Sequence, residues 1–193
     1  METEFQNINA QQSILDHGMS VCDEFKKLFT MLNSNFSINI DNCKTIPFWF
    51  FQYKNILHEL CSKHFDYICS YLIYHDCGKP FCLIIDDNGK RHFPNHAIIS
   101  KNTFLQYSSN QFIANLIEKD MLCHITKPKD YLSLVYEPYI ELLLCSALAE
   151  LHSNASMFGG FASDSFKIKF KNLDKLGQRI LDTKYNKNNS QGI

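Results

Sequence analysis

The sequence from residue 65 to residue 80 reads FDYICSYLIYHDCGKP. Ile68, Tyr71 and Leu72 recur in it at helical spacing, so the stretch predicts an apolar helix over about 65–75. The Gly-Lys-Pro sequence that follows ends the helix, because glycine and proline both disfavour its continuation. The stretch therefore indicates a helical fold in which a His-Asp pair stands where the chain leaves a helix.

Helical patterns also fill most of the chain on either side of this stretch. Only 7 Gly and 5 Pro occur among 193 residues, which disfavours an all-β sandwich rich in tight turns. One short hairpin-like loop is expected between Phe81 and Phe93, because Asn88-Gly89 is a strong turn signal. We expect an all-α fold in one domain over 1–183, followed by a disordered tail over 184–193. The other expected helices cover about 13–33, 49–63, 95–106, 108–119 and 138–152, with a last helix that begins at Ser163 or Asp164.

The composition describes a chain with ample material for a core and with no strong net charge. Hydrophobic residues make up 45% and aromatic residues 13%, which excludes global disorder. The 19 Lys and Arg residues against 20 Asp and Glu give a net charge of -1, so there is no general attraction to nucleic acid or to an anionic membrane. No apolar run approaches the ~20 residues of a membrane span. We therefore expect no membrane partner.

The eight cysteines are expected to be reduced core residues of a cytoplasmic protein. They include no C-x-x-C pair, which disfavours a thiolate zinc site. Several stand among apolar neighbours, as Cys145 does after three leucines. The N-terminal residues lack the basic and then apolar layout of a signal peptide, which disfavours an oxidising compartment.

Histidine and acidic residues are frequent around the His-Asp pair. Imidazole and carboxylate groups are ligands that suit a divalent cation, so these residues are candidates for a metal site. His17 and His64 are interpreted as surface or capping residues, and His17 falls in a helix whose expected apolar face includes Ile14, Met19 and Cys22. The candidates are His58, His75, Asp76, His92, His96, Asp120, His124, Glu150 and His152.

Two motifs in order carry a resemblance to a known family. The first is Tyr-His-Asp-Cys-Gly-Lys-Pro at 74–80, and the second is Gly-Lys-Arg-His-Phe-Pro-Asn-His at 89–96, followed by Ser100. Together they resemble the HD-domain superfamily of metal-dependent phosphohydrolases. The likeness is greatest to the branch with HDxGKP followed by HFxGH, as in the HD domain of some bacterial tRNA nucleotidyltransferases. The resemblance implies a helical bundle with an HD core over about 50–155.

The resemblance also implies a set of metal ligands. His75 and Asp76 match the metal-binding pair that gives the family its name. The first family histidine lies on an earlier helix, where His58 is the first candidate and His64 the second. Glu150 stands where the family has its last aspartate, within an apolar run. His96 and Asp120 would carry a second metal or protonate the leaving oxygen.

The remaining implied roles concern the phosphate group of a substrate. Lys79 matches a lysine that faces phosphate in the family, and Arg91 and His92 lie where they extend a positive rim beside the metal. The lysine-rich last helix is interpreted as a solvated face rather than a nucleic-acid surface.

The sequence therefore predicts a metal-dependent phosphohydrolase with one or two ions of Mn, Fe, Co, Ni or Mg. Asp76, Lys79, His96 and Asp120 are the predicted catalytic residues. The expected substrate is a phosphate ester or phosphodiester of a nucleotide or short nucleic acid, or another phosphorylated compound. Two alternatives stay open, namely an HD-fold protein that binds a nucleotide or a protein partner without turnover, and a nuclease for single strands.

Overall fold

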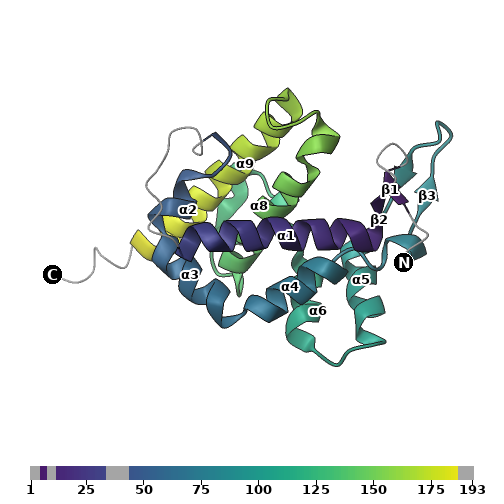
Figure 1. Cartoon of the computed structure of the whole chain (residues 1–193), viewed down its shortest axis with the longest axis horizontal. Helices are drawn as coiled ribbons and strands as arrows, with labels where there is room; N and C mark the ends of the chain where they lie inside the picture. The colour runs from purple at the N-terminus through teal and green to yellow at the C-terminus, as the bar shows by residue number, and fades with distance from the viewer. Residues whose placement is uncertain (1–4, 8–11, 34–43, 187–193) are drawn as a thin grey trace. The chain divides into compact units, whose positions relative to one another are not determined.

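The computed structural model describes residues 5–7, 12–33 and 44–186 of the chain (Figure 1). Nearly all of the regular structure in these residues is helical, which confirms the expected all-α fold. The chain divides into two compact units. The first comprises residues 1–23 and 65–121, and the second comprises residues 24–64 and 122–193.

The first unit is built around three helices that follow one another in the chain. Helix α6 packs on α4 and on α5, so these three lie side by side (Figure 1). Their facing residues, such as Ile68, Leu72 and Ile117, are buried and form the core of this unit. Its elements are β1 (Phe5–Asn7), β2 (Gln12–Ser13), the first part of α1 (Ile14–Asn33), α4 (Phe65–Tyr74), the 3₁₀ turn η2 (Lys79–Phe81), β3 (Ile84–Ile85), β4 (Arg91–His92), α5 (His96–Leu105) and α6 (Gln111–Lys119).

The second unit is centred on the apolar helix α8. Almost every residue of α8 is buried, including Glu141, because α3, α7 and α9 pack against it. Each leucine or isoleucine that is fully buried in this way contributes about 1.5–3 kcal/mol to stability. Its elements are the rest of α1, α2 (Phe48–Gln52), α3 (Lys54–Lys63), α7 (Leu122–Ile125), the 3₁₀ turn η3 (Pro128–Ser133), α8 (Ile140–Ser153), the 3₁₀ turn η4 (Asn154–Phe158), α9 (Asp164–Leu181) and a π-helical turn (Asp182–Asn186).

Side-chain caps fix where several helices begin. Helix α1 starts with a reciprocal pair: Ser13 Oγ accepts from the Asp16 backbone N–H at 3.0 Å and donates to Asp16 Oδ2 at 2.7 Å. The Asn110 side chain accepts from the N–H of Ile113 at the start of α6, and Ser163 accepts from that of Phe166 at the start of α9. Of the two residues at which the last helix was expected to begin, Ser163 is therefore the cap and Asp164 is the first helical residue.

The single helix expected over 49–63 is wrong, because the helix breaks at Tyr53. Tyr53 has φ -105° and ψ 20°, which separates α2 from α3. The Tyr53 hydroxyl donates to Asp182 at 2.6 Å, and Trp49 is buried where α2 packs on α9. We attribute the break to these contacts, which set the direction of α2 independently of α3.

The expected disorder from residue 184 onward is wrong for residues 184–186, which form the end of the π-helical turn. These residues are ordered because they contact the Glu141 side chain, which is only 3% exposed. Lys184 Nζ lies 2.8 Å from Glu141 Oε1, and the Tyr185 hydroxyl donates to the same carboxylate at 2.5 Å. A buried carboxylate needs such partners, so it holds this segment in place. Residues 187–193 of the expected tail lie outside the described residues.

Truncation at two points tests this contact. A chain that ends after Thr183 should be less stable than a chain that ends after Asn186, by about 1–3 kcal/mol, because Glu141 would lose its hydrogen-bond donors while it stays buried. Urea unfolding of the two truncated proteins measures the difference in the free energy of unfolding. Equal stabilities would contradict the role of Lys184 and Tyr185.

The cysteines and the helices of the described residues have two further properties. The seven cysteines of the described residues are free thiols, and five of them are buried. Among the described residues, no helix combines the length and the apolar character that crossing a membrane requires.

Candidate metal centre

His75 and Asp76 lie in the turn that ends α4. The turn is closed by backbone hydrogen bonds from the Cys77 N–H to the Tyr74 carbonyl and from the Lys79 N–H to the Asp76 carbonyl, each 3.0 Å long. Both side chains of the His-Asp pair are buried, with about 1% of their surface exposed. A buried carboxylate beside a buried imidazole requires compensation by a cation or by hydrogen bonds, so this turn is the candidate functional site.

Contacts with α5 fix the position of this turn. The Gly78 N–H donates to Ser100 Oγ at 2.9 Å, and the Cys77 thiol donates to the Ser100 carbonyl at 3.3 Å. A Cβ atom at residue 78 would lie 2.3 Å from the backbone nitrogen of Ser100, so only glycine permits this approach. Burial, with a smaller effect of the Asp76 charge, raises the pKa of Cys77 to about 11. The thiol is therefore neutral at pH 7 and serves as a hydrogen-bond donor.

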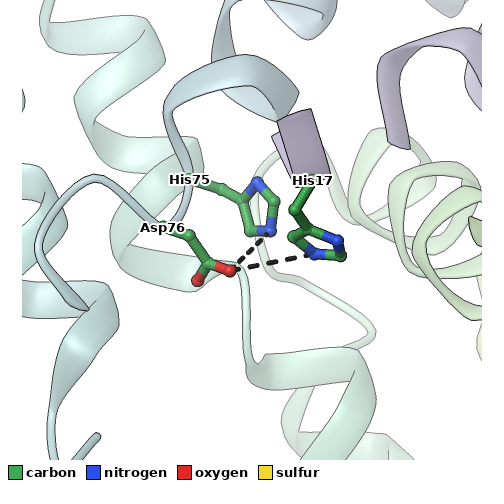
Figure 2. A group of neighbouring side chains, drawn as sticks. All are labelled: His17, His75 and Asp76. Atoms are coloured by element: carbon green, nitrogen blue, oxygen red, sulfur yellow. Dashed lines mark ion pairs between the residues drawn. The ribbon is translucent and has the colours of Figure 1, made fainter. Parts of the chain in front are cut away.

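His17 reaches the same site from α1. Its Nε2 lies 3.8 Å from Oδ2 of Asp76, and Figure 2 shows both imidazole rings turned toward that oxygen. The neighbouring Gly18 allows the approach, since a Cβ atom there would lie 2.3 Å from the Ile73 carbonyl oxygen. His17 is 1% exposed, so its interpretation as a surface or capping residue is wrong. Ile14 and Cys22 of the expected apolar face are buried as expected, whereas Met19 is 51% exposed.

The imidazole of His75 is oriented by a hydrogen bond to the backbone. Its Nδ1 lies 2.7 Å from the Leu72 carbonyl oxygen, which can only accept, so Nδ1 carries the proton. The lone pair of Nε2 is then directed at the site, 3.4 Å from Asp76 Oδ2. Protein ligands of metal ions are commonly held in this way, with the second ring nitrogen bound to a carbonyl or carboxylate.

The three side chains suit a divalent cation. Their ligand atoms, two imidazole nitrogens and one carboxylate oxygen, all lie within 4.8 Å of one another. Bonds of about 2.0–2.2 Å to a shared ion would bring two ligand atoms to at most about 4.4 Å, and the distances of 3.4 and 3.8 Å to Asp76 fall inside that limit. His17, His75 and Asp76 therefore form a group, here called the HHD cluster, that could hold a metal ion.

Two further cationic or ionisable groups surround the Asp76 carboxylate. Lys79 Nζ donates to Oδ2 at 2.5 Å, and the same ammonium lies 5.4 Å from the centre of the Phe93 ring. His96 Nε2 lies 3.7 Å from Oδ1, while its Nδ1 donates to the Phe93 carbonyl at 3.0 Å. The side chains of Lys79 and His96 are 15% and 16% exposed, so they stand between the buried HHD cluster and solvent.

Asp120 is also placed beside this site. It ends α6, it is 5% exposed, and its carboxylate accepts a hydrogen bond from the Tyr71 hydroxyl. A ligand atom of His75 lies within 4.8 Å of a carboxylate oxygen of Asp120. The Tyr71 ring also meets the His75 ring edge-on, with centroids 6.5 Å apart. Asp120 and Tyr71 thus form a second buried layer around His75.

Arg91 and His92, the predicted phosphate-binding residues, form strand β4 of the hairpin. The antiparallel pairing of β3 with β4 confirms the expected hairpin, and Gly89 at its turn has φ 75°. Asp86 organises the turn by accepting from the backbone N–H groups of Asn88 and Lys90. His92 Nε2 lies 2.8 Å from Asp86 Oδ2, so in this structure its imidazole is engaged with a carboxylate.

The hairpin provides a test based on pKa. The hydrogen bond from His92, then the one from the Lys90 backbone, holds the pKa of Asp86 below its usual range. Asp86 therefore stabilises the folded protein when the pH is above the ordinary aspartate pKa. This stabilisation is lost as the pH falls through the lower pKa that Asp86 has in the folded protein. In His92→Ala we expect the pKa of Asp86 to rise, as measured by NMR titration of its carboxyl carbon. Lys90→Ala, which keeps the backbone donor, is the control. An unchanged pKa in His92→Ala would contradict the pairing.

The other predicted ligands belong to the second unit. His58 lies on α3, where its ring stacks on Phe29 with centroids 5.5 Å apart. Glu150 lies on α8, and its Oε2 is 2.8 Å from His124 Nε2. His64 is the C-cap residue of α3, and its ring meets that of Tyr139. The roles of His58 and Glu150 as ligands stay predictions.

The remaining histidine, His152, has a structural environment in the second unit. Its Nε2 donates to the Thr45 carbonyl at 2.7 Å, and its ring packs against Phe161 and Phe166. Burial lowers the pKa of His152, with a smaller opposing effect from the Thr45 carbonyl. The imidazole is therefore neutral at pH 7 and acts as a buried hydrogen-bond donor.

Helical spacing is the signal that could have identified His17 in the sequence. Ile14, Val21, Phe25 and Leu28 are buried on one face of α1, and His17 follows Ile14 by three residues and precedes Val21 by four. A histidine on the apolar face of a helix is buried, and a buried imidazole needs a polar partner.

Comparison of the chain with protein-family models, with curated proteins and with solved structures found no match.

Proposed function

We propose that this chain is a metal-dependent phosphohydrolase that acts on a phosphate ester or phosphodiester of a nucleotide or short nucleic acid. The observation that supports the proposal is the HHD cluster, in which two buried imidazoles face one buried carboxylate. Such a set of nitrogen and oxygen ligands suits Mn, Fe, Co or Ni, and its carboxylate would also suit Mg. The sequences HDCGKP at 75–80 and HFPNH at 92–96 resemble the HDxGKP and HFxGH motifs of the HD-domain superfamily, with Asn95 in place of the second motif's glycine, and they support the same function.

The residues around the HHD cluster suit the proposed reaction. A divalent ion held by His17, His75 and Asp76 would polarise a phosphoryl oxygen and lower the pKa of a bound water. Lys79 places an ammonium group beside the carboxylate, where it would contact a phosphate oxygen. Because Nδ1 of His96 donates to Phe93, its Nε2 is the atom that would exchange a proton with the leaving oxygen.

A second candidate is a protein that binds a nucleotide or another partner without turnover. The contact of 2.5 Å between Lys79 and Asp76 favours it, because an ammonium group at that distance balances the charge of the carboxylate without a metal ion. The two candidates differ in metal content. A phosphohydrolase should hold a divalent metal, and a binding protein built on the Lys79–Asp76 ion pair should not.

Metal content and turnover together test the proposed function. The 193-residue chain should contain about one divalent ion per molecule by inductively coupled plasma mass spectrometry. It should hydrolyse at least one compound in a panel of mono-, di- and cyclic nucleotides. Removal of metal by a chelator should abolish the hydrolysis, and addition of Mn²⁺ should restore it. Folded protein that holds no metal after exposure to each ion, and that hydrolyses nothing, would favour the binding protein.

A further inference from the structure

The first unit contains a pocket that the HHD cluster does not use. Its cavity of about 440 Å³ lies among α4, α5, α6 and the turn after α4. Pockets for small organic ligands in proteins enclose about 300–1,000 Å³, so the size fits one small molecule. The lining residues are Ser70, Tyr74, Cys77, Thr103, Phe104, Tyr107, Ser108 and Ile113.

The walls of the pocket are aromatic and uncharged. Tyr74 and Phe104 lie against each other with ring centroids 5.9 Å apart and an interplanar angle of 47°, and Tyr107 adds a third ring, which is exposed. Phe104 and Ile113 are buried among the lining residues. No lining residue is Asp, Glu, Lys, Arg or His, so the pocket offers no charge to pair with a phosphate or an ammonium group.

The lining hydroxyl groups supply both kinds of hydrogen bond. The Thr103 hydroxyl donates to the Ile99 carbonyl at 2.9 Å, so its oxygen can still accept. The Ser108 hydroxyl oxygen accepts from the Asn110 N–H at 3.2 Å, so its hydrogen can still donate. A ligand that carries a donor and an acceptor on the edge of an aromatic ring would use both groups, whereas an alkyl chain would use neither.

We propose that this pocket binds a planar, uncharged heteroaromatic ring of nucleobase size. Stacking on tyrosine and phenylalanine rings supplies affinity, because every such ring has a π face. The hydroxyl groups of Thr103 and Ser108 supply orientation. The pocket goes beyond the proposed hydrolysis and does not depend on it, since none of its lining residues belongs to the HHD cluster.

The full chain can be titrated with adenosine, guanosine, cytidine and uridine by isothermal calorimetry, without added metal. At least one nucleoside should bind, while ribose 5-phosphate, which lacks a base, and hexanol, which lacks a ring, should not. Binding of either control as tightly as a nucleoside would overturn the proposal. Failure of all four nucleosides to bind folded protein would also overturn it.

Variants locate the bound ring. Ser70→Phe fills the pocket and should weaken nucleoside binding at least about tenfold, whereas Ile98→Phe adds the same group at an exposed position outside the lining and should not. Thr103→Val removes one hydroxyl at constant size and should weaken binding even if Ser70→Phe misfolds. Binding unchanged in Thr103→Val and in folded Ser70→Phe would overturn the proposal.

Asp76→Ala separates this proposal from the proposed function. Nucleoside binding should persist in that variant whether or not the chain is a phosphohydrolase, because Asp76 does not line the pocket. Loss of nucleoside binding in folded Asp76→Ala would place the nucleoside at the HHD cluster and overturn the proposal.

Discussion

His17→Ala is expected to lose its bound divalent metal, with an affinity more than about 100-fold weaker than that of the unchanged protein. Loss of an outer partner of a metal ligand already costs 10–100-fold in affinity, and His17 would be one of only two imidazole ligands in the HHD cluster. The fold should survive, because Ile14, Val21, Phe25 and Leu28 still bury the same face of α1. Metal titration followed by calorimetry, with circular dichroism as a check on folding, measures both effects.

His58→Ala is the matched control for this prediction. The sequence predicts His58 as the first histidine ligand, whereas in the structure its ring stacks on Phe29 and its Nε2 lies 3.5 Å from the Ser62 hydroxyl. We expect His58→Ala to keep the metal. If His58→Ala lost the metal and His17→Ala kept it, the sequence-based choice of ligand would be right and the HHD cluster would not be the site.

The part of the candidate site that the sequence predicts well is local in the chain. His75, Asp76 and Lys79 lie in one turn, and Gly78 allows that turn to contact α5, which begins at His96. These residues are close together because the chain turns once where the helix ends. A short sequence motif is therefore enough to predict that they are neighbours. The distance of 2.5 Å from Lys79 to Asp76 results from this local turn, whereas the 3.7 Å from His96 to Asp76 also depends on the contact of the turn with α5.

His17 could not be placed by the same reasoning, because its position depends on contact between two helices that are distant in the chain. The sequence predicts a helix over 13–33 correctly and places Ile14 and Cys22 on its buried face, but it also places Met19 there and leaves His17 at the surface. Successive residues of a helix point in directions about 100° apart, so positions close together in the sequence can lie on opposite faces. Whether residue 17 is assigned to the buried or to the exposed face decides whether its histidine faces Asp76 or solvent.

The same distinction explains the accuracy of the fold prediction. Helices that begin at a side-chain cap, such as α6 after Asn110 and α9 after Ser163, have a local cause and were predicted to within a few residues. The break at Tyr53 and the ordered turn at Tyr185 depend on Asp182 and on buried Glu141. These are tertiary contacts, and helical periodicity does not report them.

Gly18→Ala is expected to destabilise the protein by about 1–3 kcal/mol, although helix propensity alone predicts the opposite sign. Alanine in the interior of a helix is favoured over glycine by about 1 kcal/mol. At residue 18, however, a Cβ atom would lie 2.3 Å from the Ile73 carbonyl oxygen and 2.9 Å from its Cα. Backbone atoms cannot move aside as a flexible side chain does, so α1 would have to shift from α4.

This shift links packing to the HHD cluster, since His17 precedes Gly18 and His75 follows Ile73 by two residues. Gly18→Ala should therefore weaken metal binding as well as stability, even though residue 18 carries no ligand atom. Thr30→Ala, at an exposed position of the same helix, is the control for propensity and should leave metal binding unchanged. Thermal unfolding and metal titration measure the two effects. A Gly18→Ala protein that is more stable and binds metal normally would show that α1 does not approach the Ile73 carbonyl. In that case His17 would not lie beside Asp76 either.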